Sequence, residues 1–480
     1  MNSWDAERIA AAAGGRLLRG APSAPRGVRI DSREVRAGDL FVGLAGEHVD
    51  GGAYAAQALG AGAWGVLVAP EHARGLAAAA VMAHPDPLMG LQSLARAWRE
   101  ALGRDGAQVV GITGSTGKTS TKDILAALLR DALGQLGGPT AVSEENCNTE
   151  IGLPLAILAA PAGTKALVLE MAMRGAGQIA QLTAIAKPDV GVIVNVGPVH
   201  LQQLGTIAAV AAAKAELIAG MAPGTTVVVP AGEPLLAPHL RADQRTVTFG
   251  ERGDVELLSR AADGTVTIAD RARWDRCPRG SAAGAGGAAG EEHAHEGERI
   301  VVRPSFAQSH NLRNLLAAVA AARALGVAPE GRLEVHFSAL RGERLQLANG
   351  IVLINDCYNA NPMSMRAALD ELAASDATRR VAVLGDMLEL GAGERRLHRE
   401  IGAYARARGV DVLLTVGPLA GEMRGEEEGG DGSAYSVPDA AAAAALLGEL
   451  LRAGDVVLVK GSRGVGLERV AQALQNGGGG

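Results

Sequence analysis

The sequence predicts an α/β protein with three domains: a small N-terminal α/β domain, a central parallel-sheet domain of the P-loop ATPase type, and a C-terminal Rossmann-like domain. The chain has 480 residues, and at roughly 150 residues per domain this length accommodates about three domains. Short apolar runs alternate with helical patterns through most of the chain, as in βαβ units. A glycine-rich turn also lies between a β-branched run and a helical stretch, a typical phosphate-binding arrangement.

Residues 1–105 are expected to form the first domain. A short helical pattern opens the chain, and Asp31-Ser32-Arg33 forms a polar turn. Gly38-Asp39 leads into the apolar run Leu40-Phe41-Val42, and an alanine-rich helical stretch follows Asp50-Gly51-Gly52. Because turn residues separate short apolar runs from helical ones, we interpret this part as a small α/β domain.

The second predicted domain covers residues 106–335 and alternates strands with helices, which is the pattern of a parallel sheet. Strands are expected at Ala166–Leu169, Val190–Val194 and Thr226–Val229. Near 281–297 the chain consists of glycine, alanine and acidic residues, and we expect a disordered insert there. Its two histidines, His293 and His295, are interpreted as part of a solvated loop rather than as a metal site.

The third predicted domain covers residues 336–480. Its strands are expected at Ile351–Ile354, Val381–Leu384, Val412–Val416 and Val456–Val459. This alternation predicts a Rossmann-like domain that binds its ligand at the ends of the strands. The charged stretch 426–432 is expected to be a surface loop, and the four terminal glycines are expected to be disordered.

Composition excludes several classes of protein. The net charge of −6 provides no basic field that would attract nucleic acid. The three cysteines, Cys147, Cys277 and Cys357, are far apart and odd in number, which argues against a disulfide framework and a zinc site. No apolar run reaches the ~20 residues that a membrane span needs. We therefore expect a cytoplasmic protein that binds neither nucleic acid nor a membrane.

The glycine-rich turn reads Thr113-Gly114-Ser115-Thr116-Gly117-Lys118-Thr119-Ser120. Its two glycines allow successive backbone N–H groups to converge on phosphate oxygens, and the following helix adds its positive end. Lys118 can reach the terminal phosphates, and Thr119 can bind magnesium. The spacing is shorter than the standard GxxxxGK[ST] form. The turn nevertheless predicts that the chain binds ATP or GTP.

Two residues at the ends of neighbouring predicted strands favour a magnesium site beside this turn. Glu170 ends the run Leu167-Val168-Leu169, and His200 follows the next strand. A carboxylate at the end of a buried strand is unfavourable unless it is paired or binds a metal. Together with the hydroxyl of Thr119, these two side chains predict a site for magnesium.

Other polar residues leave alternatives open. Lys214 lies in an apolar helical run, where the residues alone favour a surface lysine that snorkels to solvent. Asn311 and Asn314 precede an alanine-rich helix and either cap it or bind adenine through their amides, with capping favoured. Dense polar runs follow three strands of the third domain and predict a ligand-binding face; they are 355–362, 384–387 and 460–463.

Taken together, these motifs resemble the Mur ligase family over nearly the full length of the chain. Thr113–Thr119 is similar to the ATP loop of the family, and Asp31–Arg33 with Gly38–Val42 is similar to its UDP-sugar domain. In the third domain, Asp356–Met365 and Leu384–Gly391 resemble the branch that adds D-alanyl-D-alanine. The sister branch that adds diaminopimelate or lysine would carry an Asp-Asn-Pro-Arg-type motif, which this sequence lacks.

The resemblance implies an ATP-dependent, ADP-forming amide ligase of peptidoglycan precursor synthesis. It would add D-alanyl-D-alanine to UDP-N-acetylmuramoyl-tripeptide through an acyl phosphate. The three domains would then bind the UDP-sugar-peptide, ATP and the incoming dipeptide in that order. The implied cofactors are ATP, two Mg²⁺ ions and carbon dioxide, which would convert Lys214 into a carbamate. We expect the protein to act as a monomer.

The resemblance also implies roles for individual residues. Lys118, Glu170, His200 and Lys214 would be catalytic, and Thr119, Glu170, His200 and carbamylated Lys214 would hold the metal ions. The residues expected to bind ATP are Gly114, Ser115, Thr116, Gly117, Lys118, Thr119, Ser120, Asn311, Asn314, Arg344 and Asp356. Those expected to bind the UDP-substrate are Ser32, Arg33, Asn148 and Thr149, and those expected to bind the dipeptide are Tyr358, Asn359 and Asn361.

Three alternative functions stay open at the level of sequence. The nearest is another ligase of the same superfamily, such as a folylpolyglutamate synthetase or the diaminopimelate-adding enzyme. A second is a nucleotide switch or motor that hydrolyses ATP without an acyl acceptor. The third is a binding protein without catalytic activity.

Overall fold

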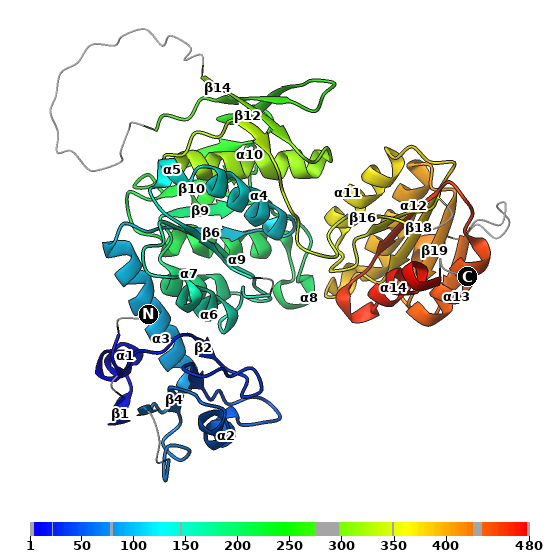
Figure 1. Ribbon diagram of the computed structural model, residues 1–480. Helices are drawn as coiled ribbons and strands as arrows, with labels where there is room; N and C mark the ends of the chain where they lie inside the picture. The colour runs from blue at the N-terminus through cyan, green and yellow to red at the C-terminus, as the bar shows by residue number, and fades with distance from the viewer. Residues whose placement is uncertain are drawn as a thin grey trace, which may run out of the picture.

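The computed structural model describes residues 4–21, 23–76, 80–144, 146–274, 297–347, 350–425 and 434–477. Their strands form three sheets, of five, ten and six strands, each covered by helices (Figure 1). The expected three-part α/β fold is therefore confirmed. The expected insert lies outside the described residues except for Gly297, and so do His293, His295, the loop 426–432 and the last three glycines.

The first sheet has the order β1-β5-β4-β3-β2, and only β1 runs antiparallel to its neighbour. The elements of this part are α1 (Ala6–Ala13), β1 (Arg16–Arg19), β2 (Val28–Arg29), β3 (Leu40–Val42), α2 (Ala55–Gly60), β4 (Gly65–Val68) and β5 (Ala80–Ala83). The strand expected at Leu40–Val42 and the alanine-rich helix after it are both present.

The long helix α3 (Pro87–Arg104) joins the first sheet to the central domain (Figure 1). It begins where the Asp86 carboxylate accepts hydrogen bonds from the first-turn N–H groups and Pro87 supplies a φ suited to a helix start. Its far half is fastened to the central domain, because the Trp98 indole donates to the carbonyl of Ala160 at 3.0 Å and Arg99 forms a 2.8 Å ion pair with Asp189.

The central sheet has the order β15-β14-β13-β12-β11-β10-β9-β6-β8-β7. Its strands are β6 (Gln108–Thr113), β7 (Thr140–Val142), β8 (Ala166–Glu170), β9 (Val190–Ile193), β10 (Thr226–Pro230), β11 (Arg245–Phe249), β12 (Val255–Arg260), β13 (Val266–Asp270), β14 (Glu298–Pro304) and β15 (Gly331–Leu333). The three strands expected in this part are confirmed. The sheet is parallel, as expected, except at β13, which pairs antiparallel with both β12 and β14. The turn between β12 and β13 is too short for the crossover that parallel strands need.

Helices cover both faces of the central sheet. α4 and α10 pack together over one face, and α6, α7 and α9 share a second core on the other. Their bounds, with those of the two short helices, are α4 (Lys118–Asp131), α5 (Leu133–Leu136), α6 (Gly152–Ala159), α7 (Gln178–Ala186), α8 (Leu201–Leu204), α9 (Ile207–Gly220) and α10 (Ser309–Ala324).

The third sheet has the order β16-β17-β21-β18-β19-β20, and it is parallel except for its edge strand β16. The strands are β16 (Glu343–Gln346), β17 (Val352–Asn355), β18 (Arg379–Gly385), β19 (Val412–Val416), β20 (Ala434–Val437) and β21 (Asp455–Lys460). α11 (Pro362–Ala373) and α12 (Glu394–Ala407) pack over one face, while α13 (Ala440–Leu450) and α14 (Glu468–Gly477) pack over the other. All four strands expected in this domain are confirmed.

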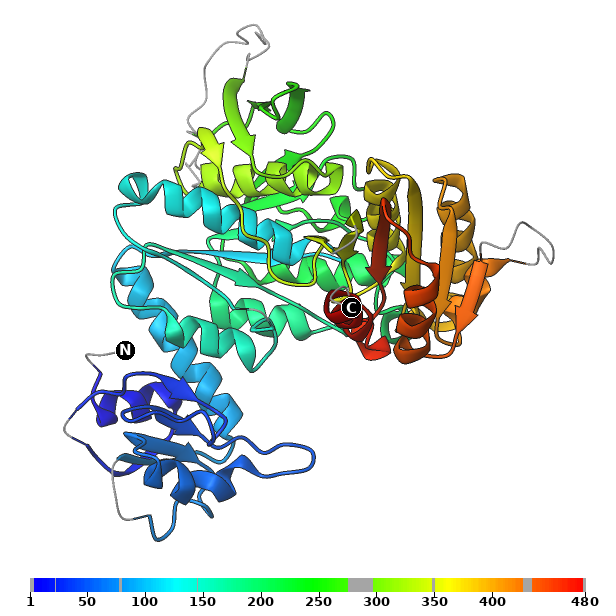
Figure 2. The same cartoon turned by 45° about the vertical axis from the view of Figure 1, so that its right-hand side comes forward.

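The third domain lies beside the central domain, close to α8 (Figures 1 and 2). Polar contacts join the two: Gln202 donates its backbone N–H to the carbonyl of Glu389 at 3.1 Å, and the Gln308 amide donates to the Glu371 carboxylate at 3.1 Å. The described part of the chain contains no helix long and apolar enough to cross a lipid bilayer.

Candidate active site

The glycine-rich loop joins the buried strand β6 to the helix α4, as predicted. Gly117 precedes α4 with φ of +77°, a left-handed conformation that favours glycine. A Cβ at this position would lie 2.7 Å from Oδ1 of Asn314, so a larger residue would also collide. The Lys118 amine donates to the carbonyl of Gly114 at 3.0 Å, and desolvation lowers the pKa of this lysine. The loop thus has the backbone of a phosphate cradle.

The segment after β9 holds the loop in place. Asn195 accepts a hydrogen bond from the Thr116 N–H at 2.9 Å and donates its own amide to the Thr116 carbonyl at 3.0 Å. The Ser115 hydroxyl accepts from the Gly197 N–H at 2.9 Å. Sequence reasoning did not identify Asn195, although its place directly after a buried strand was a usable signal. These bonds fix the shape of the loop before any nucleotide binds.

Glu170 stands at the end of β8, where the sequence predicted it, and makes three polar contacts close to the loop. The Thr119 hydroxyl donates to its carboxylate at 2.6 Å and the Asn148 amide at 2.8 Å, while its own N–H donates to the Ser143 hydroxyl at 3.1 Å. Burial would raise the pKa of Glu170, but the nearby charge of Lys118 and these hydrogen bonds hold it below the ordinary value. The carboxylate is therefore ionised and available to a cation.

Lys214 lies on α9 with 1% of its surface exposed. The interpretation of this residue as a surface lysine is wrong, because its apolar neighbours on α9 are buried in the core that α9 shares with α6 and α7. Among the residues that the structure describes, its amine has no hydrogen-bond or ion-pair partner. Desolvation, and then the charge of Lys118, lower the pKa of Lys214 well below its ordinary value. A buried amine of this kind favours the neutral, nucleophilic form.

His200 precedes α8 in a left-handed conformation, with φ of 52°. Its Nδ1 lies 2.5 Å from the Glu389 carboxylate of the third domain. Desolvation lowers the pKa of His200 even though Glu389 acts in the opposite direction. Because a carboxylate only accepts hydrogen bonds, Nδ1 is the donor, and Nε2 has no hydrogen-bond partner in the part of the chain that the structure describes. Sequence reasoning did not single out Glu389, although it lies in the run that supported the family resemblance.

The four residues proposed to hold metal lie next to Lys118 in the chain or within the range of its charge. Thr119 follows it in the chain, and the charge of Lys118 acts on the pKa values of Glu170, His200 and Lys214. In the described residues no three aspartate, glutamate, histidine or cysteine side chains lie close enough to hold a metal ion. Magnesium prefers oxygen ligands. The donor set fits magnesium when ATP supplies phosphate oxygens and Lys214 carries a carbamate.

The helix α10 carries the asparagines that were expected either to cap it or to bind adenine. The favoured capping role is wrong, because α10 begins at Ser309 and Asn311 and Asn314 lie inside it. Both asparagines are buried, and Asn314 donates to Asn311 at 3.4 Å. Asn314 also packs against Gly117, so the structure brings this motif to the phosphate loop.

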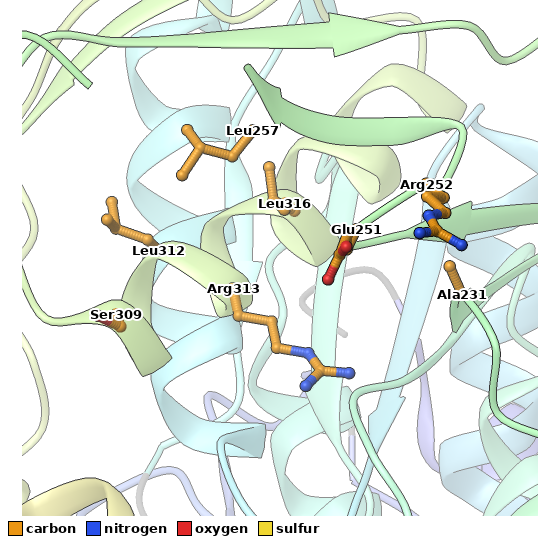
Figure 3. Close-up of a pocket in the computed structure, with 9 residues that line it drawn as sticks. Ala231, Glu251, Arg252, Leu257, Ser309, Leu312, Arg313 and Leu316 are labelled. Atoms are coloured by element: carbon orange, nitrogen blue, oxygen red, sulfur yellow. The ribbon is translucent and has the colours of Figure 1, made fainter. Parts of the chain in front are cut away.

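A pocket of about 670 Å³ runs along another side of α10 (Figure 3). Leu312 and Leu316 of the helix and Leu257 of β12 form its apolar wall. Figure 3 shows Glu251 and Arg252 reaching it from the turn after β11 and Arg313 reaching it from α10. Apolar walls with a few charged groups are typical of small-molecule sites of this volume.

The predicted nucleotide ligands of the third domain have protein partners in this arrangement. Arg344, on β16, lies 3.5 Å from Glu371 and 3.4 Å from the Ser375 hydroxyl. Asp356 follows β17 and accepts a 2.6 Å hydrogen bond from Lys460. Burial lowers the pKa of His310, beside the asparagine pair on α10, while the charges of Asp356 and Lys460 act on it in opposite directions. These residues therefore lie at the boundary between the two domains.

The residues predicted to bind the dipeptide follow β17 in the chain. The Tyr358 hydroxyl donates to Oδ1 of Asn146 in the central domain. Asn359 accepts the Ala360 N–H with its side chain at 2.8 Å. Asn361 caps α11 in a reciprocal capping box with Ser364, which gives this residue a structural role.

The residues predicted to bind the UDP-substrate lie in two separate domains, the first and the central one. Ser32 and Arg33 lie in the first domain after β2, where Arg33 binds Asp31 at 2.5 Å and holds the pKa of that carboxyl at about 2. Thr149 accepts the Gly152 N–H at 3.4 Å. Asn148 instead reaches Glu170, so the structure places it beside the phosphate loop. In the described residues no hydrogen bond or ion pair links Ser32 or Arg33 to that loop.

Comparison with known families gives three matches along the chain. The family described as Mur ligase family, catalytic domain, matches residues 25–98; Mur ligase middle domain matches 112–322; and Mur ligase, glutamate ligase domain, matches 340–463.

Similar individual proteins cover almost the whole chain. The UDP-N-acetylmuramoyl-tripeptide–D-alanyl-D-alanine ligase of Bacillus subtilis (strain 168) is 33% identical over 93% of each sequence. The crystal structure of MurF from Acinetobacter baumannii is 26% identical with a TM-score of 0.81, covering 98% of this chain and 99% of that one. The MurF ligase from Thermotoga maritima, in complex with ADP, is 28% identical with a TM-score of 0.75, covering 94% and 97%.

Proposed function

The chain belongs to the Mur ligase family, and from this membership we propose that it joins D-alanyl-D-alanine to UDP-N-acetylmuramoyl-tripeptide with conversion of ATP to ADP and phosphate. One observation carries the proposal: the phosphate loop and Glu170 meet through a 2.6 Å hydrogen bond from Thr119, in a chain whose full-length relatives bear the name of that ligase.

The reaction consists of two displacements. An oxygen of the tripeptide carboxylate forms a bond to the γ-phosphorus of ATP as the bond from that phosphorus to the bridging oxygen breaks, and ADP leaves with the electron pair. The amine nitrogen of the dipeptide then bonds to the carbonyl carbon of the acyl phosphate. Phosphate leaves with the electrons of the C–O bond, and the amine proton passes to solvent.

Both displacements bring anions together, so the chain must offset negative charge. We assign the phosphates to Lys118 and to the backbone N–H groups at the start of α4, since the N–H groups of Ser115 and Thr116 already donate to Asn195. Thr119, Glu170, His200 and Lys214, the last as a carbamate, would hold two magnesium ions. Bound magnesium supplies positive charge at the phosphate and carboxylate oxygens. Carbon dioxide adds to a neutral amine, and the depressed pKa of Lys214 favours that form.

We assign one substrate to each domain. Residues 1–105 bind the UDP-sugar-peptide through Ser32 and Arg33, residues 106–335 bind ATP, and residues 336–480 bind the dipeptide. Asn311 and Asn314 bind the adenine. Arg344 and Asp356 contact the nucleotide once the third domain closes. The protein acts as a cytoplasmic monomer.

The test is phosphate release with ATP, UDP-N-acetylmuramoyl-tripeptide and one candidate amine at a time. We expect release with D-alanyl-D-alanine and none with diaminopimelate or glutamate. Release without any amine would favour a nucleotide switch, and release with another amine would favour a different ligase. Lys118→Ala should abolish the activity. Lys187→Ala is the matched control, since Lys187 is exposed and pairs with Glu100 on the surface.

A further inference from the structure

Arg341 lies in the segment that connects β15 to β16, between two residues in left-handed conformations. Leu340 has φ of 60° and Gly342 has φ of 73°. A bulky side chain such as leucine seldom adopts this conformation, and such strain persists where surrounding contacts fix it. Here the Leu340 carbonyl accepts the N–H of Tyr358 at 3.3 Å. The backbone around Arg341 is therefore held in one specific shape.

Its side chain is held by Tyr358. The guanidinium carbon lies 4.0 Å from the centre of the tyrosine ring, and the tyrosine hydroxyl donates to Asn146 of the central domain. Two residues further along the chain, Asn148 donates to Glu170. These contacts link Arg341 to the loop that borders the phosphate site.

The guanidinium lacks a counter-anion in the described residues. Its Nε is buried there without a hydrogen-bond partner, and no carboxylate lies within ion-pair distance of it. Buried donors are almost always satisfied, so an unpaired one indicates a missing acceptor. The Arg344 guanidinium differs in this respect, because it already contacts the Glu371 carboxylate and the Ser375 hydroxyl.

Arg341 also acts on the phosphate site through its charge. Its charge reaches both Lys118 and Glu170, so the guanidinium lies within electrostatic range of the phosphate loop. Lys118 and Arg341 thus bring two positive charges to this region. Such an excess of positive charge suits a polyanion.

We propose that Arg341 is a catalytic residue that binds the phosphoryl group in transfer between ATP and the tripeptide carboxylate. This inference rests on the proposed ligase function and adds to it a residue delivered from the third-domain side. As the bond to the bridging oxygen of ATP breaks and the bond to the carboxylate oxygen forms, the guanidinium donates to the equatorial phosphoryl oxygens. Because ADP lacks the γ-phosphoryl group, the contact distinguishes ATP from ADP.

The experiment compares Arg341→Ala and Arg341→Lys with the wild type in two measurements. Calorimetry gives the Kd values of ADP and of a non-hydrolysable ATP analogue, and phosphate release gives kcat. For Arg341→Ala we expect an approximately unchanged Kd for ADP, a Kd for the analogue raised about tenfold, and a kcat lowered about 10²- to 10³-fold, as for the loss of one hydrogen-bond donor to a transition-state oxyanion. Arg341→Lys should lie between, because it keeps the charge without the planar fork.

The matched control is Arg366→Ala. Arg366 stacks on Tyr404 at 4.5 Å within the third domain, so its removal takes away a similar arginine–tyrosine contact at another place. We expect wild-type values for this control. Equal ratios of the two Kd values in Arg341→Ala and wild type, with kcat within about threefold, would overturn the role of Arg341. If Arg341→Ala does not fold, the same comparison on Arg341→Lys decides. Absence of dipeptide-dependent release by the wild type would instead refute the ligase function, and the ratio of Kd values would still test Arg341.

Discussion

Lys214 is a primary amine buried beside another lysine, and it is the residue whose environment is hardest to explain by packing alone. A buried lysine without a partner destabilises a protein unless it is neutral or modified. The charge of Lys214 acts on the pKa of His200, a residue suited to a metal ion, and the charge of Lys118 acts on both Lys214 and Glu170. Conversion to a carbamate would turn an unfavourable cation into a ligand, which accounts for the presence of an amine at this position.

Replacement of Lys214 should remove the ligase activity, and a small added carboxylate should restore part of it. We predict that Lys214→Ala lowers kcat at least about 10²-fold, in the range of lost electrostatic stabilisation. Formate or acetate should restore part of the activity by occupying the space of the carbamate. Phosphate release is the measurement, with Lys187→Ala as the surface control. A fully active Lys214→Ala would refute the carbamate.

The same residue makes stability depend on pH. In bicarbonate-free buffer the folded protein has a lowered Lys214 pKa, whereas the unfolded chain has the ordinary value of 10.5. Between these two values the unfolded state binds more protons, so the free energy of unfolding should rise with pH through that window and level off above 10.5. Lys214→Met should flatten this rise. Chemical denaturation at a series of pH values checks it, and equal slopes for both proteins would contradict it.

Single residues also mark where sequence reasoning was sufficient and where it was not. The glycine-rich loop and Glu170 were found because their chemistry follows directly from strand ends and spacing. Lys214 was misread from its own residues, because a run of alanines does not reveal which side of a helix is covered. The asparagines of α10 were interpreted as caps because the start of the helix was placed too late. Asn195, Glu389 and Arg341 depend on contacts between segments that are distant in sequence.

At the scale of elements, the site depends on the junction of β6, the phosphate loop and α4. β6 lies between β8 and β9 in the sheet, so the loop, Glu170 and the His200 segment all emerge at one edge. α10 packs against α4 and brings Asn314 to the loop. This arrangement follows from parallel strand order, which is why the strands and their polar ends could be predicted. The antiparallel pairing of β12 with β13 could not, because a short turn between strands carries no helical signal.

Gly117 tests this junction. We predict that Gly117→Ala destabilises the fold by about 1–3 kcal/mol, since alanine must adopt a left-handed conformation against Asn314. It should also weaken ATP binding, because the first turn of α4 shifts. Gly134→Ala in α5 is the control: a Cβ there would meet no atom within 4 Å, and a helical alanine stabilises by up to about 1 kcal/mol. Equal stability of both variants would show that the turn tolerates a side chain.

At the scale of the whole molecule, the third domain contacts His200, one of the proposed metal ligands, through Glu389. This residue binds His200 at 2.5 Å from a left-handed backbone of its own, with φ of 63°. It also lies 3.7 Å from Arg174 of the central domain. The position of the third domain is thereby coupled to the orientation of the His200 ring. Sequence predicted both domains but not this contact, because the relative placement of two folded units leaves no periodic signal.

Loss of the Glu389 carboxylate should therefore weaken magnesium binding. We predict that Glu389→Ala raises the magnesium concentration for half-maximal activity about 10- to 100-fold, as is usual when the partner of a ligating histidine is removed. Glu422→Ala is the control, since Glu422 pairs with Arg395 and Arg399 on the surface of the same domain. The measurement is phosphate release against magnesium concentration. If activity depends on magnesium concentration in the same way in Glu389→Ala and in the wild type, Glu389 has no role in magnesium binding.

The central claim is that the tripeptide carboxylate takes the γ-phosphoryl group of ATP before the amine attacks. The most direct measurement uses UDP-N-acetylmuramoyl-tripeptide labelled with ¹⁸O in its reacting carboxylate, followed by mass analysis of the released phosphate. An acyl phosphate predicts that each phosphate released together with peptide bond formation carries one labelled oxygen. Phosphate without the label would contradict the account, because ATP would then be hydrolysed by water.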